Sequence, residues 1–161
     1  MRIRDALDPL LIEDALWHAS PADISEMREI LADLASAVAR HDPTAFVRAN
    51  WSLHARIAAV SPHAMLRSLY INLLDQIESH TLAVLPLGEQ PLPEYIAARH
   101  VLHVAIVDAL EHQDRGQALT LIAEHNTSSV LPGAQIPAGH TPAGHTAAGH
   151  TAGEAAAAAG R

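Results

Sequence analysis

Apolar residues recur along the chain at steps of three and four, the spacing that places them on one face of an α-helix. The segment behind Pro21 shows this most clearly, with an apolar stripe at Ile24, Met27, Leu31, Leu34 and Val38. Alternation with a period of two, which is typical of strands, extends over no useful length. The pattern therefore predicts an all-α protein, folded as an antiparallel bundle of about six helices with short connections.

Four serine-proline or aspartate-proline pairs predict where helices begin. In such a pair the first residue caps the helix, and proline takes the first helical position because the N–H that it lacks has no partner there. We expect the first of these helices to end near Ala19, with room for a short helical lead-in before it, and the second to end near Arg40. The four pairs are Asp8-Pro9, Ser20-Pro21, Asp42-Pro43 and Ser61-Pro62.

A loop that contains proline and glycine, from about Leu85 to Pro93, separates the first four predicted helices from the last two. The last helix begins near Arg115. The spacing of apolar residues also predicts which of them face inward in the remaining helices. They are Phe46, Leu53, Ile57 and Val60 in the third helix, Met65, Leu66, Leu69, Leu73 and Ile77 in the fourth, Ile96, Ile106, Val107 and Leu110 in the fifth, and Ala118, Leu121 and Ile122 in the sixth.

The composition changes near Leu131. Beyond it Ala-Gly-His-Thr recurs with a period of five residues, and small and turn-forming residues dominate. We therefore expect residues 1–131 to form one helical domain and residues 132–161 to be a disordered, low-complexity tail. Weak metal scavenging is the alternative role for the tail histidines, which are His140, His145 and His150.

Composition and charge narrow the classes of function. The 161-residue chain carries ten basic side chains, all arginine, against 18 acidic ones, and its formal net charge is −8. Such a chain is a poor partner for nucleic acid, since neutralising phosphates needs a concentrated basic surface. It has no cysteine, which excludes disulfides and thiolate metal sites. Because it has neither a run long enough to span a membrane nor a signal-peptide core, we expect a cytoplasmic protein without a membrane partner.

Polar residues interrupt three of the predicted apolar faces. Asn50 and His54 lie four residues apart at the edge of the third stripe, so their side chains can converge on one point. His103 lies in the middle of the fifth stripe, and His125 continues the sixth. His100 also lies near the inward sector of the fifth helix, and spacing alone does not separate it from His103.

The simplest interpretation of any one of these residues is a core side chain bonded to the backbone. Their joint occurrence makes a shared partner more favourable than separate ones, because each buried imidazole without a partner costs about 1–3 kcal/mol. A divalent metal satisfies several imidazoles at once, and neutral imidazole is the commonest metal ligand. The spacing therefore favours a metal site to which three helices contribute.

These residues also carry a resemblance to a known family. The sequence Ala-Asn-Trp-Ser-Leu-His at residues 49–54 resembles the [Asp/Asn]-x-x-x-His helix of the FCD domain, the ligand-sensing C-terminal domain of FadR-type GntR transcriptional regulators. The resemblance extends from about Arg4 to Ser129. The last two helices are similar to the family's closing signature in the order and spacing of His103, Asp114, Ala118 and His125.

The resemblance implies a helical bundle around a buried cavity that holds a metal. When the metal ligands of the family are carried over to the matching positions of this sequence, they fall on Asn50, His54, His103 and His125. The resemblance therefore favours His103 over His100. We expect zinc as the metal, with nickel or manganese as alternatives. Family members use the metal to bind a small organic acid, so the resemblance further implies a small carboxylate effector and a homodimer.

Two further residues are candidate effector contacts. Arg99 lies one helical turn before His103 and can reach a carboxylate in the cavity. The alternative is an arginine that faces solvent or extends along the apolar stripe. Tyr70 can donate a hydrogen bond, although the pattern does not determine its face.

Three positions depart from the family's pattern. Asn50 stands where many relatives have aspartate, and an amide binds divalent ions more weakly than a carboxylate does. Leu102 stands where an acidic residue often precedes the histidine, and His63 where asparagine is usual. The departures remove no predicted ligand, but they leave the class of effector open.

Family regulators carry a winged-helix DNA-binding domain before this one, whereas the present chain begins almost at the first bundle helix. Three explanations for this difference are a misassigned start codon, a truncated gene and a sensor domain that stands alone. We expect contact with DNA only through a winged-helix domain that is not in this chain.

Two other functions compete with a sensor, although we expect no enzymatic activity. The first is a small metalloenzyme in which the three histidines activate water. Such a site needs a nearby carboxylate as general base, whereas Asp108 and Glu124 are neighbours of the interior stripes in sequence and should point elsewhere. The second is a decayed bundle whose histidines only satisfy one another.

Overall fold

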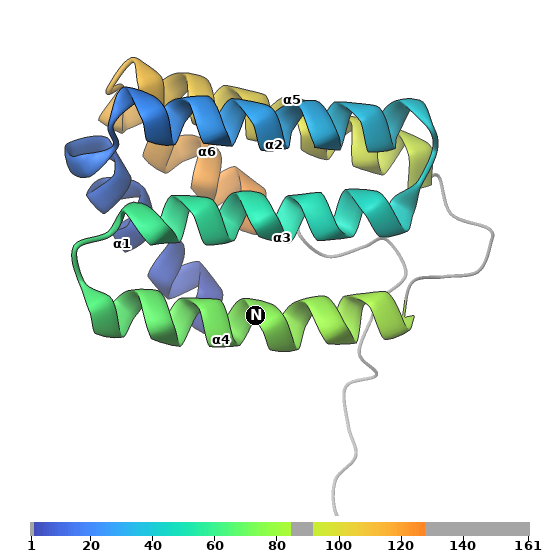
Figure 1. Cartoon of the computed structure of the whole chain (residues 1–161), viewed down its shortest axis with the longest axis horizontal. Coiled ribbons are helices and arrows are strands. Elements are labelled where there is room, and N and C mark those ends of the chain that lie inside the picture. The colour runs from blue at the N-terminus through green and yellow to red at the C-terminus, as the bar shows by residue number, and fades with distance from the viewer. Residues whose placement is uncertain (1, 85–91, 128–161) are drawn as a thin grey trace, which may run out of the picture.

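The computed structural model describes residues 2–84 and 92–127, and over these ranges the chain forms six α-helices and no strand (Figure 1). The predicted all-α bundle is therefore confirmed. The predicted tail at 132–161, its boundary near Leu131 and most of the predicted loop lie outside the described residues. The helices are α1 (Arg2–His18), α2 (Pro21–Ala39), α3 (Pro43–Val60), α4 (Ala64–Val84), α5 (Leu92–Glu111) and α6 (Arg115–Thr127).

Two of the predicted helix starts are confirmed by their capping groups. The Ser20 side chain accepts a hydrogen bond from the Asp23 amide, and the Asp23 carboxylate accepts one from the Ser20 amide, which forms a capping box at the start of α2. The Asp42 carboxylate accepts a hydrogen bond from the Ala45 amide at the start of α3. Each cap satisfies backbone donors that the helix itself leaves without partners.

The start predicted at Asp8-Pro9 is wrong. α1 begins at Arg2, so that Pro9 lies inside the helix and Asp8 is a buried helical residue instead of a cap. The Asp8 carboxylate is paired with Arg4 and accepts a hydrogen bond from Tyr70. These tertiary contacts hold the first two turns of α1 although Pro9 removes a backbone hydrogen bond.

The start predicted at Ser61-Pro62 is displaced. Ser61 is the C-cap of α3, and α4 begins only at Ala64. The Ser61 hydroxyl donates to the Asp14 carboxylate across to α1 at 2.5 Å and accepts from the His63 amide at 3.2 Å. The serine therefore fixes the turn between the two helices.

Figure 1 shows α2, α3 and α4 lying side by side in sequence order, with α1 and α6 behind α3. α2 packs against α3 and α5, and α1 packs against α3 and α6. The larger hydrophobic core is formed by buried apolar residues of α1, α2, α3, α5 and α6. Most of the predicted stripes are therefore confirmed, with Val38, Val60 and Leu121 partly buried. α3 thus runs through the centre of the bundle, where its polar residues can meet those of other helices.

The predicted stripe of α4 is wrong in part. Met65 is 86% exposed and Leu69 is 52% exposed, whereas Tyr70 and Leu74 are buried. Among the described helices α4 packs chiefly on α3, so these helices cover mainly one of its faces. Because apolar residues occupy more than one face of this helix, periodicity alone does not select the buried one.

None of the helices in the described ranges combines the length and the apolar character that crossing a membrane requires.

Candidate metal centre

Three imidazoles from three helices meet in the centre of the bundle. The Nε2 atom of His125 on α6 lies 3.2 Å from Nε2 of His54 on α3 and 3.0 Å from Nε2 of His103 on α5. The candidate ligand atoms of the three residues all lie within 4.8 Å of one another, and each residue is at most 3% exposed. The predicted convergence of His54, His103 and His125 is therefore observed.

The structure also shows which of the two candidate histidines on α5, His100 or His103, faces the interior. His103 is in the cluster, whereas His100, three residues earlier on α5, is partly exposed and outside it. Asn50 lies one turn before His54 on α3, and its side chain is buried at 8% exposed. Its role as a fourth ligand stays a prediction.

Arg99 is buried, at 6% exposed, and does not face solvent. Its guanidinium crosses from α5 to α6, where Nη1 donates to the His125 carbonyl at 2.8 Å and Nη2 lies 2.5 Å from His125 Nε2. Its Cζ atom lies 6.0 Å from the centre of the Tyr95 ring. The structure thus brings a permanent positive charge to the histidine cluster.

Tyr70 faces the same interior and is 1% exposed. Its hydroxyl donates to the Asp8 carboxylate and lies 3.5 Å from His54 Nδ1. Burial, and then the neighbouring Asp8 carboxylate, raise the pKa of Tyr70 well above its ordinary value. The phenol therefore keeps its proton and remains a hydrogen-bond donor.

Sequence analysis missed a buried ion pair beside the cluster. Arg4 and Asp8 on α1 are each 2% exposed, and Arg4 Nε lies 3.3 Å from an Asp8 oxygen. Arg4 also donates from Nη2 to the Asn126 side-chain oxygen at 2.9 Å, and its Cζ lies 5.7 Å from the centre of the Trp51 ring. The signal was present in the sequence, since both residues continue the buried face of α1 at steps of four.

The outer nitrogens of two imidazoles have oxygen partners that select one tautomer. Because the Tyr70 proton goes to Asp8, the Tyr70 oxygen is an acceptor for His54 Nδ1–H. The Asn126 side-chain oxygen, which lies 3.4 Å from His125 Nδ1, is an acceptor for that nitrogen. In these tautomers the Nε2 lone pairs of His54 and His125 face each other, and such an arrangement fits a cation.

All three imidazoles are held neutral. Burial lowers the pKa of His54 and His125 well below the ordinary value of 6.5, and it lowers the pKa of His103 to about 3. The Arg99 charge is the next cause for His103 and His125, and for His54 the next cause is that a proton on its ring would be unfavourable beside the His125 imidazole. Neutral imidazole is the form that binds metal.

These pKa values predict how the stability of the metal-free protein depends on pH. Between about pH 3 and pH 6.5 the unfolded state binds a proton on His103 that the folded state does not, so the free energy of unfolding falls as the pH falls through this window. The slope is up to about 1.4 kcal/mol per pH unit for each such imidazole. His54 and His125 act in the same direction, whereas the raised pKa of Asp8 opposes them.

Urea denaturation in the presence of a chelator, at pH 4.5, 5.5, 6.5, 7.5 and 8.5, measures this dependence. We expect little change between pH 7.5 and 8.5, which serves as the control range. A free energy of unfolding that is the same at pH 4.5 as at pH 7.5 would contradict the neutral, buried state of the cluster.

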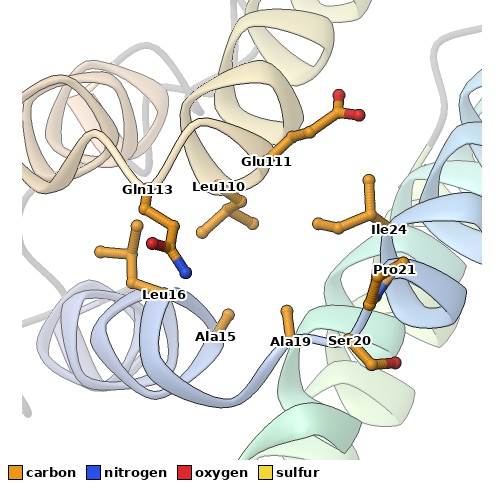
Figure 2. Close-up of a pocket in the computed structure, with 9 residues that line it drawn as sticks. All are labelled: Ala15, Leu16, Ala19, Ser20, Pro21, Ile24, Leu110, Glu111 and Gln113. Atoms are coloured by element: carbon orange, nitrogen blue, oxygen red, sulfur yellow. The ribbon is translucent and has the colours of Figure 1, made fainter.

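A pocket of about 320 Å³ lies apart from this cluster, where the end of α1 and the start of α2 meet the turn between α5 and α6 (Figure 2). Its apolar residues are joined by Ser20, Glu111 and Gln113, and no cationic side chain lines it. The pocket is therefore a poor site for an organic acid. Its lining residues are Ala15, Leu16, Ala19, Ser20, Pro21, Ile24, Leu110, Glu111 and Gln113.

The fold and the site together define an all-α bundle with a buried cluster of candidate metal ligands. The chain belongs to the FCD domain family, whose model matches residues 1–128. FCD domains are the ligand-binding domains of GntR-family transcriptional regulators, so the family predicted from the sequence is confirmed. This assignment supports an effector-sensing regulatory domain and not an enzyme.

A solved structure with the same fold is that of E. coli McbR/YncC, with a TM-score of 0.65 and 18% sequence identity. The similarity covers 80% of this chain and 64% of the McbR/YncC chain, so the present chain spans less than two thirds of that protein. At this identity the likeness shows the fold alone. No curated protein matches the sequence.

Proposed function

We propose that this domain senses a small carboxylate through a divalent metal held by Asn50, His54, His103 and His125. The observation that carries the proposal is the convergence of three buried imidazoles whose candidate ligand atoms lie within 4.8 Å of one another. The sensing event controls DNA binding by a winged-helix domain. The resemblance to the family adds the expectation of a homodimer, which sedimentation of the purified protein tests.

The donor set fits a divalent transition metal. Three neutral nitrogens and an amide oxygen suit zinc, with nickel or manganese as alternatives, because imidazole is a ligand of intermediate softness. The outer contacts of His54 and His125 direct their Nε2 lone pairs into the cluster. A bound metal supplies Lewis acidity, and its charge remains available to an anion because none of the four ligands is negative.

Arg99 and Tyr70 extend this site beyond the metal ligands. The Arg99 guanidinium can donate two parallel hydrogen bonds to a carboxylate, and it lies beside His125. Tyr70 supplies a protonated hydroxyl near His54. Both side chains come from helices that also pack on α3 or α6, so they are held close to the cluster.

The competing enzyme needs a carboxylate that could activate water. Asp108 is partly exposed and paired with Arg28 at 2.6 Å, and Glu124 is exposed. Asp8 is a buried carboxylate connected to His54 through the Tyr70 hydroxyl, but it is already engaged by Arg4 and Tyr70 and is outside the cluster of candidate ligands. The arrangement favours ligand binding over hydrolysis.

A thermal-shift experiment tests the sensor proposal. We expect citrate to raise the melting temperature of zinc-loaded protein by several degrees more than that of chelator-treated protein, because a ligand that binds the folded state stabilises it. The protein is purified without a histidine tag and dialysed before its metal content is measured. Equal citrate shifts in the two samples would place the anion elsewhere, and a protein that takes up no zinc, nickel or manganese would favour a decayed bundle.

A further inference from the structure

The Arg99 guanidinium makes an unusual contact inside the histidine cluster. Although Arg99 is on α5, its Nη2 lies 2.5 Å from His125 Nε2 on α6, and its Nη1 donates to the His125 backbone carbonyl at 2.8 Å. Both side chains are buried, Arg99 at 6% and His125 at 0% exposed. The pair therefore belongs to the protein interior and not to a surface contact.

The hydrogen bond between Arg99 and His125 can have only one direction. A guanidinium can only donate hydrogen bonds, so His125 Nε2 must accept with its lone pair. The Asn126 side-chain oxygen lies 3.4 Å from His125 Nδ1 and provides the acceptor for the ring's own N–H. An imidazole nitrogen has one lone pair in the ring plane, and that pair serves either an N–H donor or a cation.

The same nitrogen is the centre of the candidate metal site. His125 Nε2 is within 3.2 Å of His54 Nε2 and within 3.0 Å of His103 Nε2. A metal held by the three residues must therefore use the atom that Arg99 contacts. A second positive charge at this place would also be repelled by the guanidinium, strongly so in a buried site of low polarity.

We propose that Arg99 and the divalent metal compete for the lone pair of His125 Nε2, so that metal binding displaces the guanidinium and makes it available to an anion. This inference rests on the proposed function, because it concerns the regulation of that same site. In the metal-free protein Arg99 supplies the positive charge that the converging lone pairs require.

The exchange couples the two ligands. A guanidinium displaced from His125 remains on α5, one turn before His103, where a carboxylate bound near the metal can accept its hydrogen bonds. An anion that engages Arg99 therefore removes the metal's competitor. By reciprocity of linkage, citrate raises the affinity for zinc by the same factor by which zinc raises the affinity for citrate.

Zinc titration of untagged protein, with and without citrate, tests the competition. We expect Arg99→Met to bind zinc at least about tenfold more tightly than wild type and to lose most of the effect of citrate on zinc affinity. In chelator the same variant should melt at a lower temperature than wild type, because the contacts that the Arg99 guanidinium makes with His125 are lost. Arg28→Met, at an exposed ion pair with Asp108 and Glu111, is the control and should leave zinc affinity unchanged.

The outcomes separate this inference from the function on which it rests. Zinc affinity in Arg99→Met that equals or falls below that of wild type would overturn the competition and leave the metal site standing. No zinc binding by either protein would overturn both. Arg99→Gln, whose shorter neutral side chain cannot contact His125 in the same way, repeats the measurement if Arg99→Met does not fold.

Discussion

Replacing His125 with alanine removes most of the bound zinc and lowers the melting temperature of the protein. His125 is the residue that links the cluster, because its Nε2 contacts the Nε2 atoms of both His54 and His103. We expect zinc affinity to fall at least about 100-fold, since second-shell changes alone cost 10–100-fold. His103→Ala should act in the same direction, because it removes another of the three imidazoles.

The loss of stability has two causes. The side chain of His125 is fully buried, so its removal leaves a cavity, and it also leaves Arg99 without one of its acceptors. Together these effects should lower the free energy of unfolding by about 2–4 kcal/mol in the metal-free protein. In the zinc-loaded protein the loss is larger, because the variant also forfeits the stabilisation that bound zinc provides.

Elemental analysis after dialysis measures the metal, and circular dichroism measures the melting temperature. His100→Ala is the matched control, because this histidine lies three residues from His103 on the same helix but outside the cluster. It should retain its zinc and lose little stability. Undiminished metal in both His125→Ala and His103→Ala would end the assignment of these ligands.

Replacing Arg4 with methionine has the largest expected effect on folding. Arg4 and Asp8 are buried together, and removing one partner of a buried ion pair costs about 3–5 kcal/mol because the other charge is left without compensation. Methionine keeps much of the side-chain volume, so the loss reports on charge more than on packing. The melting temperature should fall by roughly 10 °C or more.

A double variant distinguishes the charge from other effects. Arg4→Met with Asp8→Asn leaves neither charge buried and should recover part of the stability that Arg4→Met loses. Arg28→Met is the exposed comparison, and its cost should stay within about 1 kcal/mol. If the free energy of unfolding of Arg4→Met is within about 1 kcal/mol of the wild-type value, the ion pair between Arg4 and Asp8 does not hold the start of α1 in place.

Much of the bundle could be predicted from local patterns. The starts of α2 and α3 follow from Ser20-Pro21 and Asp42-Pro43, because a capping side chain acts on backbone amides within its own turn. The same kind of signal failed at Asp8-Pro9. There, contacts with Arg4 and with Tyr70 on a distant helix decide that Asp8 is buried inside a helix.

The candidate site shows the same division. His54, His103 and His125 could be placed on apolar faces, and the family resemblance favoured His103 over His100. The burial of Arg99 and the face of Tyr70 could not be predicted, because long side chains on the edge of a stripe can extend either way. Each was fixed by a partner distant in sequence: His125 for Arg99 and Asp8 for Tyr70.

The sequence by itself determined the helical class, most of the apolar stripes and the inward positions of His54 and His125, because periodicity and capping depend on neighbours within one or two turns. The choice of His103 over His100 came from the family resemblance. Only the tertiary structure decided which face of α4 is covered, that Arg4 and Asp8 are buried, and that Arg99 contacts the cluster. These outcomes depend on how the helices pack around α3, which brings together polar groups more than 60 residues apart in the chain, such as Asp8 and Tyr70. Local preferences do not specify such contacts, since the free energy that stabilises them comes from burial and from partners on other helices.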